Sequence, residues 1–148
     1  EQFRQMEINK EFLETANVFG KKYGTTKQTI EQTINMGKSV ILDIDWQGAR
    51  ELKKSHFQSV SIFILPPTLQ ALNGRLLDRG DDPIEIQARM NKAIKEISHY
   101  REYDYVITNE IFETSLQAIE SIITGSFYCF NLRKKQFDHL VQEIIENQ

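Results

Sequence analysis

Two aspartates close an apolar segment, and their spacing indicates a polar face. Side chains of an extended chain alternate between two faces, so Asp43 and Asp45 would lie together, with Gln47 beside them. The apolar side chains of the segment share the opposite face: Val40, Leu42, Ile44 and Trp46. An unpaired buried carboxylate is costly, so this pair requires a partner or a ligand. Two carboxylates suit Mg²⁺, a cationic partner, or donors on a base or ribose, whereas a solvated or salt-bridged face is the simpler alternative.

A further carboxylate, Glu14, falls in a stretch that predicts a strand over residues 12–20. In that strand Glu14 shares a face with Phe12, Ala16 and Val18, so it would have apolar neighbours. A carboxylate in such surroundings needs hydrogen-bond donors, and the edge of guanine offers adjacent N–H groups at N1 and N2. A partly exposed strand glutamate is the plainer interpretation.

Arginines form the third set of candidate residues. Arg75 and Arg79 are four residues apart, so they share one helix face, away from the stripe of Leu69, Leu72 and Leu76. Arg89 lies about one turn into the next predicted helix. Guanidinium forks match phosphate oxygens and stabilise the charge that develops in phosphoryl transfer. Solvated helix arginines are equally common, so this pattern alone leaves both interpretations open.

The elements that must position these residues alternate along the chain. Helix patterns occupy residues 2–10, 25–37, 46–54, 68–101, 111–125 and 126–147, and strand patterns occupy residues 12–20, 38–46, 59–67 and 103–110. Gly20 and Gly24 predict a turn between them, and residues 82–85 predict a helix start with aspartate as N-cap and proline at N1. Alternating strands and helices predict an α/β fold with a mostly parallel sheet, in which residues 38–46 and 59–67 are buried strands.

Composition limits the classes of function. The 148 residues carry a formal net charge of −3, which argues against bulk binding to nucleic acid or to an anionic membrane. The single cysteine, Cys129, cannot form an intramolecular disulfide, so a reducing cytosol is the expected compartment. No apolar run approaches the roughly 20 residues that span a bilayer. The polar N-terminus starts in a helical pattern without methionine, which we interpret as a truncation.

Several strings together resemble the guanylate kinase family in order and spacing: FLETANVFGKKYGTT, SVILDIDWQGAR, FILPP, RLLDRG and SHYREYDYVITNE. The resemblance covers nearly the whole chain. It implies a P-loop nucleoside-monophosphate-kinase-like parallel sheet flanked by helices, in a single domain. Residues 1–26 would end a GMP-binding subdomain, residues 27–67 and 101–148 would form the core, and residues 68–100 would form a helical lid.

The resemblance also implies a role for each candidate residue. On the GMP side, Glu14 would accept hydrogen bonds from guanine, Thr25 would contact guanine, Tyr23 would hold the phosphate, and Asp45 would face the substrate. On the ATP side, three lid arginines would close on the phosphates: Arg75, Arg79 and Arg89. Asn109 would lie near adenine, and Asp43 would lie near the Mg²⁺ that ATP carries. The implied partners are therefore GMP and ATP, and the apolar stripe of residues 126–147 would cover either its own core or a second copy.

Some family features do not occur in these residues. The phosphate-binding motif G-x-x-x-x-G-K-[ST] and the Ser-x-Thr-Thr-Arg segment are absent, and Glu110 stands where the family has aspartate after Asn109. A catalytically inert guanylate-kinase-like domain that binds phosphopeptides is thus the alternative to an enzyme. The retained Asp45, Arg75 and Arg79 favour the enzyme, because a scaffold does not require them.

We predict that a polypeptide of these 148 residues alone has little or no kinase activity, whereas a full-length parent with the phosphate loop is active. The reason is that the loop and its lysine cradle the β- and γ-phosphates during transfer. Coupled measurement of ADP release from both proteins checks this, and robust turnover by the shorter polypeptide would contradict it. Titrating the full-length protein with GMP and with a phosphopeptide separates the enzyme from the scaffold.

Overall fold

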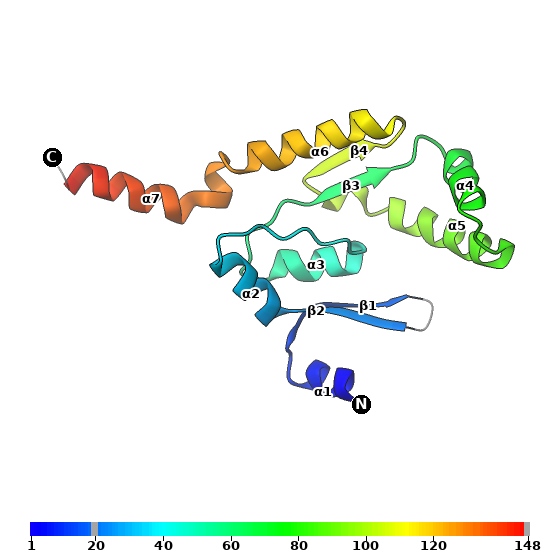
Figure 1. Ribbon diagram of the computed structural model, residues 1–148, viewed down its shortest axis with the longest axis horizontal. Helices are drawn as coiled ribbons and strands as arrows, with labels where there is room; N and C mark the ends of the chain where they lie inside the picture. The colour runs from blue at the N-terminus through cyan, green and yellow to red at the C-terminus, as the bar shows by residue number, and fades with distance from the viewer. Residues whose placement is uncertain (19–20, 147–148) are drawn as a thin grey trace. The chain divides into compact units, whose positions relative to one another are not determined.

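The computed structural model describes residues 1–18 and 21–146, which fold as two compact units (Figure 1). The first unit, Glu1–Ser59, contains a β-hairpin and three helices: α1 (Gln2–Ile8), β1 (Phe12–Val18), β2 (Lys21–Thr26), α2 (Lys27–Asn35) and α3 (Trp46–Lys54). The second unit, Val60–Gln148, contains β3 (Ile62–Leu65), α4 (Leu69–Asp78), α5 (Pro83–Ile97), the 3₁₀ turn η1 (Tyr100–Glu102), β4 (Tyr105–Thr108), α6 (Phe112–Ser126) and α7 (Phe130–Glu146). The predicted α/β class is confirmed.

The hairpin of the first unit is antiparallel, and its register places Glu14 opposite Thr25 and Ala16 opposite Tyr23. The predicted turn around Gly24 is wrong, because Gly24 lies inside β2, opposite Thr15. The reason is steric: a Cβ at Gly24 would come within 2.7 Å of the Phe12 ring, so glycine lets that ring lie across the strand. Gly20, the other glycine of the predicted turn, lies outside the described residues.

The two helices that follow the hairpin each begin at a residue whose side chain caps the helix. Thr26 caps α2 by accepting a hydrogen bond from the Thr29 amide, and Gly37, at φ +73°, follows its C-terminus. Helix α3 packs against β1 (Figure 1). The small core of this unit contains the buried side chains of Leu13, Ile30 and Ala49.

The predicted strand over residues 38–46 is wrong. Residues 38–45 are irregular, and Trp46 begins α3 instead of ending a strand. A strand needs a neighbour for its backbone groups, and the two described sheets pair only β1 with β2 and β3 with β4. The alternation of faces survives in part, because Val40, Leu42 and Ile44 are half-buried. Ile41, expected inside, is instead 85% exposed.

The second unit contains a parallel pair of strands. Strand β3 runs beside β4 with Ile62 opposite Tyr105 and Leu65 opposite Thr108. Both strands were predicted in the correct places but are shorter than the predicted segments 59–67 and 103–110. Strand β3 is not buried on both faces as expected, because Ile64 is 51% exposed. The long connection through α4 and α5 allows the parallel pairing, and α6 follows β4 and contacts it.

Helices α4 and α5 pack together as a helical hairpin over most of the predicted segment 68–101. Thr68 caps α4 through the Ala71 amide, and Asp82 caps α5 through the Ile84 amide with Pro83 in the first turn, as predicted. Between the helices, Gly80 adopts φ +81°, which favours glycine. The ends of the helical hairpin are therefore determined by capping hydrogen bonds and by a glycine between the helices.

The C-terminal part of the chain is helical, as predicted, but divided differently. Helix α6 ends at Ser126, and α7 begins at Phe130 and is irregular at Arg133. Of the predicted apolar stripe, Phe137 is half-buried, while Leu140 and Ile144 are largely exposed. No helix in the described ranges 1–18 and 21–146 is long and apolar enough to cross a membrane.

Replacing Gly24 by alanine should destabilise the hairpin by roughly 1–3 kcal/mol, because the new methyl group forces the Phe12 ring to move. The matched control is Gly74→Ala in α4, where a Cβ meets nothing within 4 Å; it should stabilise its helix by about 0.5–1 kcal/mol. Urea unfolding of both variants measures the difference. Equal stability of Gly24→Ala and the parent protein would contradict the packing argument.

Candidate functional site

Glu14 is a buried carboxylate, with only 5% of its surface exposed. Its Oε1 accepts a hydrogen bond of 2.7 Å from the hydroxyl of Thr25, on the opposite strand. A Cβ at Gly48 would lie 3.2 Å from Glu14 Oε2, so the carboxylate lies against the first turn of α3. The positive end of a helix favours a carboxylate in this place. The partly exposed interpretation of Glu14 is therefore wrong.

The hairpin gathers three of the predicted residues on one face. Opposite residues of an antiparallel pair share a face, so Glu14 with Thr25 and Ala16 with Tyr23 are neighbours on it. Tyr23 is 55% exposed. An ionised carboxylate has about four acceptor positions, so Glu14 can take further donors beside the Thr25 hydroxyl. This face can bind a ligand that carries paired N–H groups.

The predicted carboxylate face of Asp43 and Asp45 does not lie on a strand. Asp45 turns into the N-cap of α3, where its Oδ1 accepts hydrogen bonds from the amides of Gln47 at 3.0 Å and Gly48 at 3.2 Å. Asp43 is exposed in the irregular segment that precedes it. The local bonds of Asp45 explain the outcome, because they start a helix where an extended strand was expected. Asp45 and Glu14 thus contact the same first turn of α3, through Gly48.

In the second unit, Arg75 and Asn109 lie together. The Arg75 Nη2 donates to the backbone carbonyl of Asn109 at 2.8 Å and to that of Glu110 at 3.5 Å. The Asn109 side chain accepts from the hydroxyl of Ser115, which is buried, at 3.3 Å. The backbone N–H of Asn109 extends the strand pairing by donating to the backbone carbonyl of Leu65 at 2.7 Å. Ser115 was not among the predicted residues, since a serine in the first turn of a helix carries no distinctive signal.

Arg79 and Arg89 both contact Asp81, a residue that sequence analysis missed. The Arg79 guanidinium donates to both carboxylate oxygens, with Nε 2.8 Å from Oδ1. Arg89 Nε lies 3.2 Å from Oδ2, and the Asp81 side chain is 11% exposed. The hydrogen bond from Arg79 lowers the pKa of Asp81 and raises that of Arg79. The available signal was an acidic residue two positions after Arg79.

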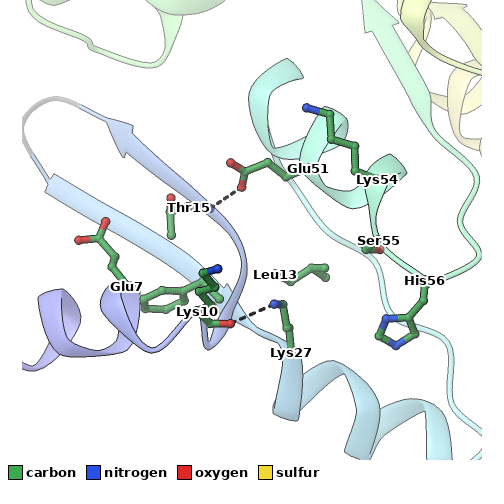
Figure 2. Close-up of a pocket in the computed structure, with 10 residues that line it drawn as sticks. Glu7, Lys10, Leu13, Thr15, Lys27, Glu51, Lys54, Ser55 and His56 are labelled. Carbon is green, nitrogen blue, oxygen red and sulfur yellow. Dashed lines mark hydrogen bonds between the residues drawn. The ribbon is translucent and has the colours of Figure 1, made fainter.

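A hollow in the first unit is separate from these residues (Figure 2). It has a volume of about 780 Å³, and its lining includes Leu13 and Thr15, whose side chains alternate with that of Glu14. Its polar lining is already engaged in part, because Glu51 accepts from the Thr15 amide at 3.3 Å and Lys27 donates to the Lys10 carbonyl at 3.0 Å. None of the predicted site residues lines this hollow.

The comparisons with known proteins agree with this arrangement of helices and strands. A crystal structure of guanylate kinase from Anaplasma phagocytophilum matches with a TM-score of 0.70 and 33% identity, over 92% of this chain and 70% of that one. The fold is therefore that of the nucleoside monophosphate kinases. Guanylate kinase from Pseudomonas savastanoi pv. phaseolicola is 43% identical over 145 residues, which are 97% of this chain and 68% of that protein.

A second relative and a family model extend this result. Guanylate kinase from Shewanella denitrificans is 48% identical over 124 residues, which are 83% of this chain and 60% of that protein. The guanylate kinase family model matches residues 1–126. The chain therefore belongs to the guanylate kinase family, whose members are ATP:GMP phosphotransferases. Helix α7 lies beyond the part that the family model matches.

The contact between Arg79 and Asp81 predicts a measurable titration. Because the pKa of Asp81 is lowered, the stability that this contact provides is present above the ordinary aspartate range, near pH 4, and is lost as the pH falls through the lowered value. Carboxyl-detected NMR should give a midpoint for Asp81 below that range. In an Arg79→Gln variant the midpoint should rise toward it, and identical midpoints in the two proteins would contradict the contact.

Proposed function

We propose that the hairpin face that carries Glu14, Thr25 and Tyr23 binds the guanine end of GMP. The carboxylate of Glu14 would accept the N1 and N2 donors, the Thr25 hydroxyl would contact the base, and the Tyr23 phenol would hold the phosphate. The observation that carries this proposal is the buried Glu14 carboxylate, fixed by Thr25 and the first turn of α3. A preset acceptor pair recognises a base with paired donors and rejects one that lacks them.

The arginines of the helical hairpin would serve the other substrate. Arg75, Arg79 and Arg89 would contact the ATP phosphates and stabilise charge in the transition state, and Asn109 would lie near adenine. The bond from Arg75 to the Asn109 carbonyl supports this assignment, because it links the phosphate-binding helix to the end of β4, where parallel sheets bind ligands. The division into GMP-binding residues 1–26, core and lid residues 68–100 belongs to the same proposal.

Asp45 would face GMP while it caps α3, and Asp43 would lie near a Mg²⁺ ion that arrives with ATP. No group of three or more metal-ligating side chains occurs within residues 1–18 and 21–146. The carboxylates of Asp43 and Asp45 nevertheless fit Mg²⁺, because this ion is usually held by phosphates, water and one or two carboxylates rather than by a protein cage. An exposed carboxylate such as Asp43 is a suitable donor. When bound, the ion neutralises charge on the phosphates.

The reaction is a direct transfer between the two nucleotides. An oxygen of the GMP phosphate forms a bond to the γ-phosphorus of ATP, the bond from that phosphorus to the β–γ bridging oxygen breaks, and ADP and GDP are released. The proposed residues supply position and charge, and no covalent enzyme intermediate is needed. Closure of the lid over the phosphates would exclude water and limit hydrolysis of ATP.

The proposed substrates indicate the cellular compartment in which the protein works. We place the protein in the cytoplasm, where GMP and ATP are available and where the unpaired Cys129 stays reduced. The exposed apolar residues of α7, among them Leu140, Val141 and Ile144, would allow two copies to associate. Neither nucleic acid nor a membrane is a proposed partner.

In the full-length protein, Glu14→Gln should raise the KM for GMP roughly 10- to 100-fold and leave the KM for ATP within about twofold. The reason is that a charged acceptor for two N–H groups is replaced by an amide with one acceptor and one competing donor. Initial rates with each nucleotide varied in turn measure both constants. The control is Glu51→Gln, an exposed carboxylate on the hollow beside β1, which should leave both KM values unchanged. An unaltered KM for GMP in Glu14→Gln would sink the proposed base contact.

A further inference from the structure

Asp81 lies between the two helices of the helical hairpin and gathers an arginine from each side. Arg79 ends α4, and Arg89 lies in the second turn of α5. Both guanidinium groups contact the same carboxylate, and Arg79 uses two of its donors on the two oxygens. Gly80, at φ +81°, makes the tight turn that brings Asp81 back to Arg79. The arrangement is therefore built by the loop itself.

The shape of this contact matches that of a bound phosphate. A guanidinium fork grips two oxygens of a carboxylate in the same way as two oxygens of a phosphate group. The donors that Arg79 gives to Asp81 are consequently unavailable to a phosphate until the carboxylate is displaced. With only 11% of its side chain exposed, Asp81 is held close against the arginines and is not a freely solvated surface acid.

We propose that Asp81 is an internal counterion for the phosphate-binding arginines, a positioning residue that phosphate oxygens replace when a polyphosphate binds. This inference rests on the proposed assignment of Arg79 and Arg89 to the ATP phosphates. In the nucleotide-free protein, Asp81 keeps both guanidinium groups converged on one point. A polyphosphate then competes with the carboxylate for a site that is already assembled.

Competition between Asp81 and a polyphosphate for the arginines predicts the direction in which a substitution of Asp81 changes polyphosphate affinity. Asparagine at position 81 offers one neutral acceptor in place of two charged oxygens, so it competes less well for the arginines. Binding of a polyphosphate should therefore become tighter when Asp81 is replaced by Asn. A purely structural contact predicts the opposite, since a loosened loop would hold the arginines less well and weaken binding.

The test measures the dissociation constant of inorganic tripolyphosphate by calorimetry in the full-length protein. Asp81→Asn should bind about three- to tenfold more tightly than the parent protein. The matched control is Asp82→Asn, which removes the same charge one residue away, where the carboxylate caps α5 and asparagine caps equally well. Equal or weaker binding by Asp81→Asn relative to Asp82→Asn overturns the proposal.

Two further measurements keep the outcomes distinct. If Arg79→Lys weakens tripolyphosphate binding while Asp81→Asn does not tighten it, the phosphate role of Arg79 stands and the counterion role of Asp81 fails. If Arg79→Lys has no effect, the phosphate assignment fails and takes the inference with it. Should Asp81→Asn not fold, NMR of the arginine Nε–H groups in the parent protein decides the matter. Both signals, Arg79 and Arg89, should shift with one dissociation constant, and unshifted signals at saturation overturn the proposal.

Discussion

The first unit is organised by the need to satisfy one buried carboxylate. The buried Glu14 carboxylate is compensated by Thr25, which donates to it from the opposite strand, and by the first turn of α3, which lies against it. The observed hairpin register brings Thr25 opposite Glu14, and a side chain at position 48 would crowd the carboxylate, because its Cβ would lie 3.2 Å from Oε2. The N-cap bonds of Asp45 begin α3 at the same turn. A group that would otherwise destabilise the fold thus determines where a strand, a turn and a helix meet.

The second unit satisfies its cations in a related way. Arg75 donates to backbone carbonyls after β4, and Arg79 and Arg89 share the carboxylate of Asp81. The charge-assisted hydrogen bonds of Arg75 and Arg79 give these flexible side chains a defined position. In both units, therefore, the residues suited to nucleotide chemistry are held by polar contacts within the protein.

The candidate residues were chosen from sequence, whereas their surroundings came only from the structure. Glu14, Thr25 and Tyr23 follow from the strand pattern and the family resemblance, and the structure places them on one hairpin face. The strand expected to carry Asp43 and Asp45 did not form, because an apolar run with alternating faces does not specify a hydrogen-bonding neighbour for the strand. Asp81 and Ser115 were missed for a similar reason, since their importance depends on residues that reach them from other elements or from the next helix.

The sequence by itself determined the features that depend on near neighbours along the chain. Caps at Thr26 and Asp82, the stop at Gly37 and most helix spans follow from bonds between residues a few positions apart. Only the tertiary structure decided how deeply Glu14 is buried, why Gly24 lies within a strand, and which carboxylate receives Arg79 and Arg89. Burial and charge pairing depend on atoms from distant segments, and a local pattern carries no information about which segments will meet.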